Sequence, residues 1–79
     1  MDIDAKNIKF RNCKILNADF CSSIFSNCIF DNVLIRNSAL VGVTFNKCNF
    51  VKCKFSNTQL GVSVKDCKVK GLIITKEAF

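Results

Sequence analysis

The residues best equipped for chemistry in this sequence are six cysteines, and their surroundings limit what they can do. A thiol acts as a nucleophile when a neighbouring base activates it, and it binds metal when further ligands lie at suitable spacing. The chain contains no histidine, no C-x-x-C pair, no glycine-rich phosphate loop and only six acidic residues. We therefore expect a protein that is not an enzyme, with no catalytic, cofactor-binding or metal-binding residues and no small-molecule substrate.

The cysteines belong to a repeat with a period of five residues, and such periods identify repeat architectures. A large apolar residue returns at every fifth position without a break: Phe10, Ile15, Phe20, Phe25, Phe30, Ile35, Leu40, Phe45, Phe50, Phe55 and Leu60. Two positions before each lies a smaller or slimmer residue: Ile8, Cys13, Ala18, Ser23, Cys28, Val33, Ser38, Val43, Cys48, Cys53 and Thr58. Both sets must share one core.

A period of five excludes the ordinary secondary structures. An α-helix with about 3.6 residues per turn would scatter these phenylalanines around its whole circumference. A flat strand would send successive phenylalanines to opposite faces, because its side chains alternate. One core results only if the backbone turns a corner once per unit and coils around a shared axis.

This pattern resembles the pentapeptide-repeat family over about residues 3–74. Its unit is a small residue, a polar residue, then Leu or Phe, then two mostly polar residues, as in 18–22, 48–52 and 53–57. The resemblance implies an all-β fold, a right-handed, quadrilateral parallel β-helix with four units, or about 20 residues, per coil. The 79 residues then make roughly 3.5 coils.

The chain is expected to form a single domain over residues 1–79, since it has no proline and only three glycines to mark a linker. Regular repeats occupy residues 8–60. A register slip follows at residues 60–62, because Lys65 stands where an apolar residue is due and a shift by one restores the pattern. Residues 62–79 would supply the last units and a cap.

Five of the cysteines occupy the small inward position, and Cys21 alone follows a large residue directly. Cys28, Cys48 and Cys67 should stack as a ladder on one side of the coil. Neighbouring rungs are close enough for a disulfide, but parallel side chains give poor geometry for one, so we expect reduced core thiols.

Compartment follows from what the sequence lacks. The first residues show no basic region followed by an apolar core, and no apolar run approaches the length of a membrane span. We expect a bacterial, cytoplasmic protein with no membrane partner.

The net charge of +6 is predicted to be one-sided. The units of Phe10, Phe30, Phe50 and Val69 share one side, and the corners flanking it collect ten of the twelve basic residues: Lys6, Lys9, Arg11, Lys14, Lys47, Lys52, Lys54, Lys65, Lys68 and Lys70. The candidate basic surface consists of Lys9, Arg11, Lys14, Lys52, Lys54, Lys68 and Lys70. It would meet phosphate or an acidic protein, or its lysines would simply solvate the strands and discourage edge pairing.

Two apolar features add candidate contacts. Cys21, Ile24 and Val41 should gather at one corner, at positions that the family usually fills with polar residues. Ile73 and Phe79 are candidates for association at the C-terminal end, because an open solenoid end exposes apolar rungs and strand edges.

We expect a non-catalytic protein-interaction or scaffold module whose partner is another protein. Three alternatives remain open: a DNA mimic that binds and protects DNA gyrase, as the resemblance implies; a module that binds nucleic acid or an acidic partner through the basic surface; and a self-associating structural subunit, such as a homodimer joined at its C-terminal end. The basic charge and the short chain disfavour the DNA mimic. The lack of an outward aromatic residue weakens nucleic-acid binding.

Overall fold

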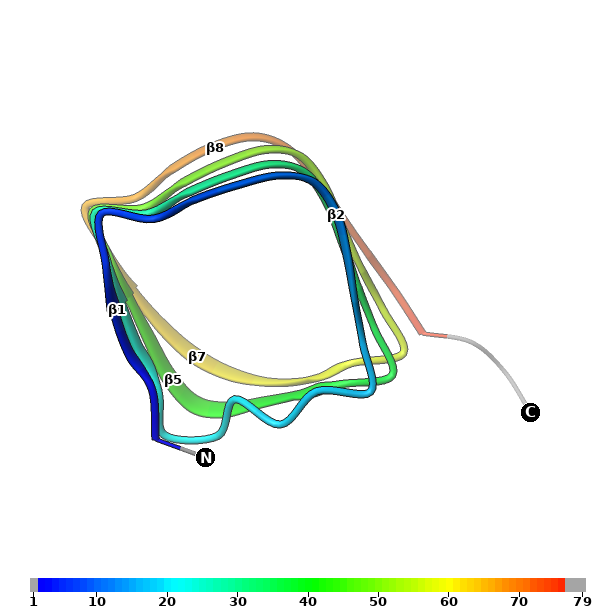
Figure 1. Ribbon diagram of the computed structural model, residues 1–79. Helices are drawn as coiled ribbons and strands as arrows, with labels where there is room; N and C mark the ends of the chain where they lie inside the picture. Colours follow the sequence, from blue (N-terminus) through cyan, green and yellow to red (C-terminus); the bar gives the residue numbers. More distant parts are fainter. Residues whose placement is uncertain (1, 77–79) are drawn as a thin grey trace.

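A computed structural model describes residues 2–76 as a four-sided solenoid built entirely from strands (Figure 1). The strands are β1 (Asp4–Lys6), β2 (Lys9–Leu16), β3 (Ile24–Ser26), β4 (Ile29–Arg36), β5 (Ala39–Asn46), β6 (Asn49–Ser56), β7 (Gln59–Lys65) and β8 (Lys68–Thr75). Within residues 2–76, the structure contains no helix long and apolar enough to span a membrane.

The strands form two parallel four-stranded sheets, β1-β3-β5-β7 and β2-β4-β6-β8. Each long strand bends around a corner and therefore covers two sides of the square. In the regular coils each residue pairs with the residue 20 positions further on, so that Phe10 lies beside Phe30 and Phe30 beside Phe50. The predicted quadrilateral β-helix and the shared side of these phenylalanines are confirmed.

We name the four sides by the inward residue of the first coil: the Phe10 side, the Ile15 side, the Phe20 side and the Phe25 side. Strands β2, β4, β6 and β8 cover the Phe10 side and then the Ile15 side. Strands β5 and β7 cover the Phe20 side and then the Phe25 side. Every side chain that points outward thus belongs to one of these sides or to a corner between them.

The corners depend on residues that tolerate a left-handed backbone. Asparagine accepts positive φ more readily than other side chains, and it fills much of three corner columns. The positive-φ asparagines are Asn7, Asn12, Asn17, Asn27, Asn32, Asn37 and Asn57. Their side chains also bond between rungs, as where the Nδ2 of Asn32 donates to the Oδ1 of Asn12 at 2.9 Å. Asparagine is therefore the commonest corner residue among the described positions.

Stacked aromatic rings fill the solenoid axis. The rings of Phe10 and Phe30 are parallel with centroids 4.8 Å apart, and those of Phe30 and Phe50 are 5.0 Å apart. A second column stacks Phe25 on Phe45 at 5.3 Å, and Phe45 meets Phe50 edge-on at 5.1 Å. Because both columns interdigitate in offset and edge-to-face contacts, the core gains stability beyond simple burial.

The small inward residues also form hydrogen bonds with backbone groups of neighbouring coils. The buried thiol of Cys48 donates to the carbonyl of Phe25 at 3.3 Å, and that of Cys53 donates to the carbonyl of Phe30 at 3.2 Å. The Sγ of Cys67 accepts from the backbone N–H of Cys48 at 3.4 Å, which confirms the predicted ladder. All six cysteines, each within the described residues, are reduced thiols.

The register slip lies where the sequence predicts it. Val41 pairs with Gly61 and Val43 pairs with Val62, so that Gly42 has no counterpart in the last coil. Gly42 holds the corner with φ of 73°, whereas Gly61 is not in the left-handed region. The deletion therefore removes the left-handed corner residue itself, and a Cβ at Gly61 would meet the Cα of Val41 at an ordinary contact distance of 3.5 Å.

We expect Phe30→Ala to lower the free energy of unfolding by about 3–5 kcal/mol, as for other buried Phe truncations. Phe30 is only 2% exposed and contacts rings in both columns. Phe10→Ala is the matched control, since Phe10 lies in the same column but is half-buried on the first rung. Urea unfolding should show the larger loss for Phe30→Ala; equal losses would contradict the stacked register.

Candidate interaction surface

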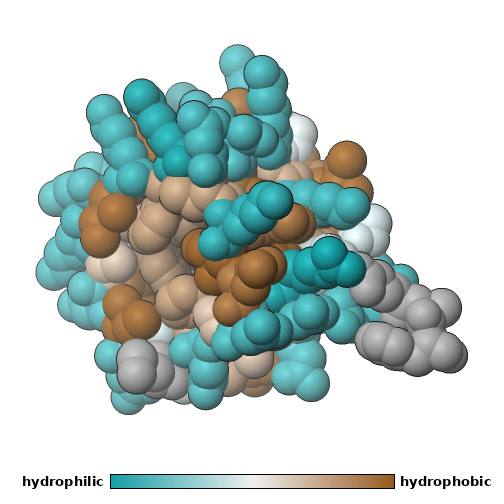
Figure 2. Space-filling model, turned by 45° about the vertical axis from the view of Figure 1, so that its right-hand side comes forward, coloured by the Kyte–Doolittle hydropathy of each residue, from teal (hydrophilic) through white to brown (hydrophobic). Residues whose placement is uncertain are grey.

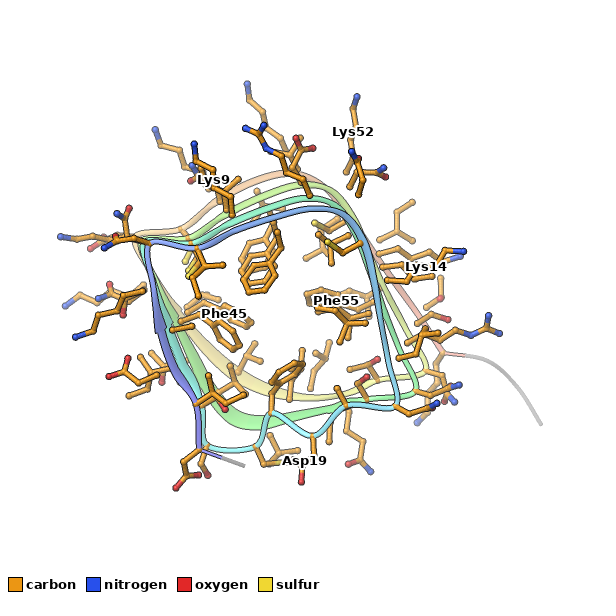
Figure 3. The ribbon with its side chains drawn as sticks, in the orientation of Figure 1. Lys9, Lys14, Asp19, Phe45, Lys52 and Phe55 are labelled. Atoms are coloured by element: carbon orange, nitrogen blue, oxygen red, sulfur yellow. The ribbon has the colours of Figure 1, made fainter. Side chains whose placement is uncertain are left out.

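The predicted basic residues lie on two adjoining sides and the corner between them. Lys9, Arg11, Lys68 and Lys70 point outward from the Phe10 side, in register with one another across the coils. Lys52 stands at the corner with φ of 52°. Lys14 and Lys54 extend from the Ile15 side. All seven are exposed, and Figure 3 shows Lys9, Lys52 and Lys14 directed away from the axis, whereas Phe45 and Phe55 point inward.

Arg36 extends this surface, although the sequence analysis did not include it. It follows Leu34 on β4, lies in the outer column of the Ile15 side and is exposed. The five-residue period places it on the Ile15 side, beyond the corners that flank the Phe10 side. We define the basic surface by its eight cations: Lys9, Arg11, Lys14, Arg36, Lys52, Lys54, Lys68 and Lys70.

Acidic charge is nearly absent from these two sides. Of the described residues, only Asp31 places a carboxylate there, beside Arg11 in the register. Asp19 points outward on the opposite side (Figure 3). The backbone N–H of Cys21 donates to the Asp19 carboxylate at 3.0 Å and holds the pKa of Asp19 below its ordinary value. The charge asymmetry of the solenoid is therefore maintained at neutral pH.

Apolar side chains interrupt the cations on the same surface. Ile29 lies between Lys9 and Asn49, and Leu34 lies between Lys14 and Lys54. Ile73 follows Lys54 in the last coil and is 59% exposed. Figure 2 brings the right-hand side of Figure 1 forward, and there apolar surface shows between hydrophilic side chains. The basic surface is thus mixed in character, unlike a plain polycation.

A shallow depression of about 250 Å³ lies on this surface, at the corner between the Phe10 and Ile15 sides. Its lining consists of two exposed corner amides, three lysines, Leu34 and two inward residues: Asn12, Asn32, Lys14, Lys52, Lys54, Leu34, Cys13 and Val33. The bonded amides of Asn12 and Asn32 form one edge of the depression. Long lysine side chains and a recessed leucine account for its concave shape.

The candidate apolar residues Cys21, Ile24 and Val41 lie around the corner between the Phe20 and Phe25 sides. The backbone N–H of Ser22, which follows Cys21, donates to the carbonyl of Val41 at 2.9 Å and so ties these rungs together. Ile24 lies two residues further around the corner. Ile24 is 45% exposed and Val41 is 48% exposed. This patch is small and lies on the sides opposite the basic surface.

The residues that form the C-terminal end face differ from those expected. Ile73 pairs with Lys54 and points outward from the Ile15 side, so it does not lie on the end face. The end face consists of inward residues that no further coil covers within the described chain: Leu60, Val62, Val64, Val69 and Ile74, each at least 36% exposed. Phe79 lies outside the described residues.

Burial makes the core thiols poor nucleophiles. Burial raises the pKa of the Cys48 thiol from 9.0 to about 11, and it raises the pKa of Cys53 as well. Both thiols therefore stay protonated at neutral pH. Among the described residues, no group of three His, Cys, Asp or Glu side chains is arranged to hold a metal ion.

Comparison with known proteins identifies a family and several structurally similar chains. The family model of pentapeptide repeats matches eight copies over residues 6–38 and 28–61. A solved structure of trypsin-treated QnrB1, a plasmid-mediated fluoroquinolone resistance protein, is similar with 17% identity and a TM-score of 0.37. The match covers 91% of this chain and 44% of QnrB1, so the chain spans less than half of that protein's length. No curated protein matches.

We expect the unfolding free energy to fall as pH rises from about 9 to about 11, in part because of Cys48. The folded state holds the thiol proton in this window, whereas the unfolded chain releases it, so the unfolded state gains stability. Cys48→Ala should show a smaller fall than the wild type in urea unfolding at each pH. Cys21→Ala, which alters a thiol at an outward position, is the control; an equal effect of both variants would contradict the assignment.

Proposed function

Since the chain belongs to the pentapeptide-repeat family, we propose that it is a non-catalytic protein-binding module that docks an acidic partner protein on its basic surface. The observation that carries the proposal is the concentration of eight cations and one carboxylate on two adjoining sides. The positive electrostatic potential of these cations accelerates association with an acidic partner and disfavours association with basic proteins. The flat sides of a filled solenoid suit broad docking better than the enclosure of a small ligand.

The mixture of apolar and basic side chains supports a protein partner. Leu34 and Ile73 interrupt the lysine column of the Ile15 side. An apolar side chain gains nothing against a phosphate backbone, but it gains burial against apolar residues of a protein. The outward positions described on the basic surface also carry no aromatic residue on which a base would stack. Nucleic-acid binding is therefore the weaker alternative.

The DNA-mimic alternative requires a surface with the opposite charge. A mimic of duplex DNA must present acidic groups where phosphates would stand. Here the Phe10 and Ile15 sides carry lysine and arginine, and the net charge of the chain is +6. We therefore do not propose gyrase protection by mimicry for this chain.

The test compares two triple charge reversals with the same change in net charge. Lys9→Glu, Lys54→Glu and Lys68→Glu alter the basic surface, whereas Lys6→Glu, Lys65→Glu and Lys76→Glu alter exposed lysines that do not belong to it. We expect the wild type and the second variant to capture an acidic protein from host lysate at low salt. The first variant should lose most of it, because close charge pairs steer and hold the complex.

Nuclease treatment and a salt series complete this test. A captured protein should survive nuclease and weaken as salt screens the charges. Capture that both triple variants lose equally would show that net charge alone is responsible and would contradict a defined surface. Capture that nuclease abolishes would replace the proposal with nucleic-acid binding.

A second candidate function is self-association through the C-terminal end. The supporting observation is the exposed end face, where Val64 is 64% exposed and Ile74 is 58% exposed. These residues occupy inward positions, and the edges of β7 and β8 lie beside them. An uncovered apolar rung with adjacent strand edges favours contact with a second copy.

We expect Val64→Ser with Ile74→Ser to weaken such association by about tenfold or more, since two partly buried aliphatic contacts are lost. Sedimentation velocity over a range of protein concentrations measures it. Ile73→Ser is the matched control, because Ile73 has similar exposure but points outward from the Ile15 side. A wild type that stays monomeric throughout, or an equal effect of the control, would exclude the end face as the contact.

A further inference from the structure

One column of outward residues on the Ile15 side alternates strictly between basic and apolar. In the register, Lys14 lies beside Leu34, Leu34 beside Lys54, and Lys54 beside Ile73. Lys14 and Lys54 are exposed, Leu34 is half-buried, and Ile73 is 59% exposed. The alternation runs parallel to the solenoid axis, across the strands rather than along them.

The neighbouring column carries the opposite phase in the first two coils. Leu16 accompanies Lys14 on β2, and Arg36 accompanies Leu34 on β4. Leu16 pairs with Arg36 in the register and is 51% exposed. In the first two coils, basic and apolar side chains therefore alternate both along and across the strands, whereas in the third coil Ser56 follows Lys54 and only the column of Lys14, Leu34, Lys54 and Ile73 continues the alternation.

The spacing of this column fits one kind of secondary structure. Adjacent rungs lie about 4.8 Å apart, so that Lys14 and Lys54 stand about 10 Å apart with Leu34 midway. An α-helix rises about 5.4 Å per turn, so a stripe of side chains on one face meets successive rungs nearly in phase. An extended strand repeats on one face at about 6.7 Å and falls out of phase after two rungs.

We infer that the basic surface receives an amphipathic α-helix of the partner protein, lying along the solenoid axis on the Ile15 side. Its contacting stripe reads acidic, apolar, acidic, apolar at successive turns, so that carboxylates meet Lys14 and Lys54 and an aliphatic residue meets Leu34. This inference rests on the proposed function and specifies its partner. The depression of about 250 Å³ beside Leu34 receives the apolar ridge of the helix.

Charge complementarity and the apolar positions together select this occupant. Each carboxylate of the helix would face a lysine, and the corner Lys52 lies beside the same depression. The exposed area of Ile73 would be covered by the last apolar turn, since its position continues the column. A duplex nucleic acid would leave Leu34 and Ile73 against phosphates, where they gain no burial.

The experiment uses two stapled helical peptides of identical composition. In the in-phase peptide, two Glu lie seven residues apart, and one Leu follows each Glu by four residues. All four side chains then lie on one stripe of the helix. In the out-of-phase peptide, each Leu follows its Glu by two residues and so lies on the opposite face. Fluorescence anisotropy against the full chain should show the in-phase peptide binding at least about tenfold more tightly, since only it matches charges and apolar contacts together.

Protein variants locate the site. Lys14→Glu with Lys54→Glu should abolish the preference for the in-phase peptide, and Leu34→Ala should reduce it several-fold. Ile24→Ala is the control, since Ile24 is an exposed aliphatic residue on the Phe25 side and should change nothing. Circular dichroism verifies that each variant keeps the wild-type fold.

The outcomes separate this inference from the proposal beneath it. Equal, salt-sensitive binding of both peptides, lost on charge reversal, would overturn the helical register and leave the acidic-partner proposal standing. Tighter binding of a DNA duplex than of either peptide would overturn both. Binding of the in-phase peptide that survives Lys14→Glu with Lys54→Glu would place the contact elsewhere and overturn the inference.

Discussion

The structure depends on the stacking of equivalent residues between coils. Each regular coil places a large apolar side chain directly above its equivalent 20 positions earlier, so ring stacking and the parallel backbone ladder share one register. Neither can form without the other, because a shift by one residue would turn every phenylalanine outward. The backbone and the core therefore also fix the positions of the outward side chains, including those of the basic surface.

The corners make this stacking possible in so short a chain. A corner every five residues requires a left-handed backbone at the same point of each unit, and asparagine meets the requirement while bonding to the rung before it. The small inward residues complete the arrangement, since the thiols of Cys48 and Cys53 donate to carbonyls of the previous coil. Cys48 and Cys53 therefore act as small hydrogen-bonding core residues, and burial raises the pKa of both thiols.

The repeat predicts most of this fold because a period of five has only one way to form a single core. The five-residue period alone places the stacked phenylalanines, the cysteine ladder, the asparagine corners and the slip at Gly61. The outer surface is less determined. The exposed apolar rung of an open end makes Ile73 a candidate for C-terminal association, whereas the register puts its side chain on the Ile15 side beside Lys54. The depression beside Leu34 depends on how lysine side chains stand around a shorter residue, which no periodicity encodes.

A filled solenoid has its own route to specificity. Its axis is occupied by phenylalanine, so the interior offers no room for a substrate, and recognition must use the sides and the ends. On each side, equivalent residues of adjacent coils lie about 4.8 Å apart, and backbone hydrogen bonds rather than side-chain packing set this spacing. Substitutions at outward positions can therefore change charge and hydrophobicity without moving neighbouring positions. A column that alternates between basic and apolar side chains at this step selects a partner by the spacing of its side chains as well as by their charge. The spacing of side chains along one face distinguishes a helix from other acidic chains.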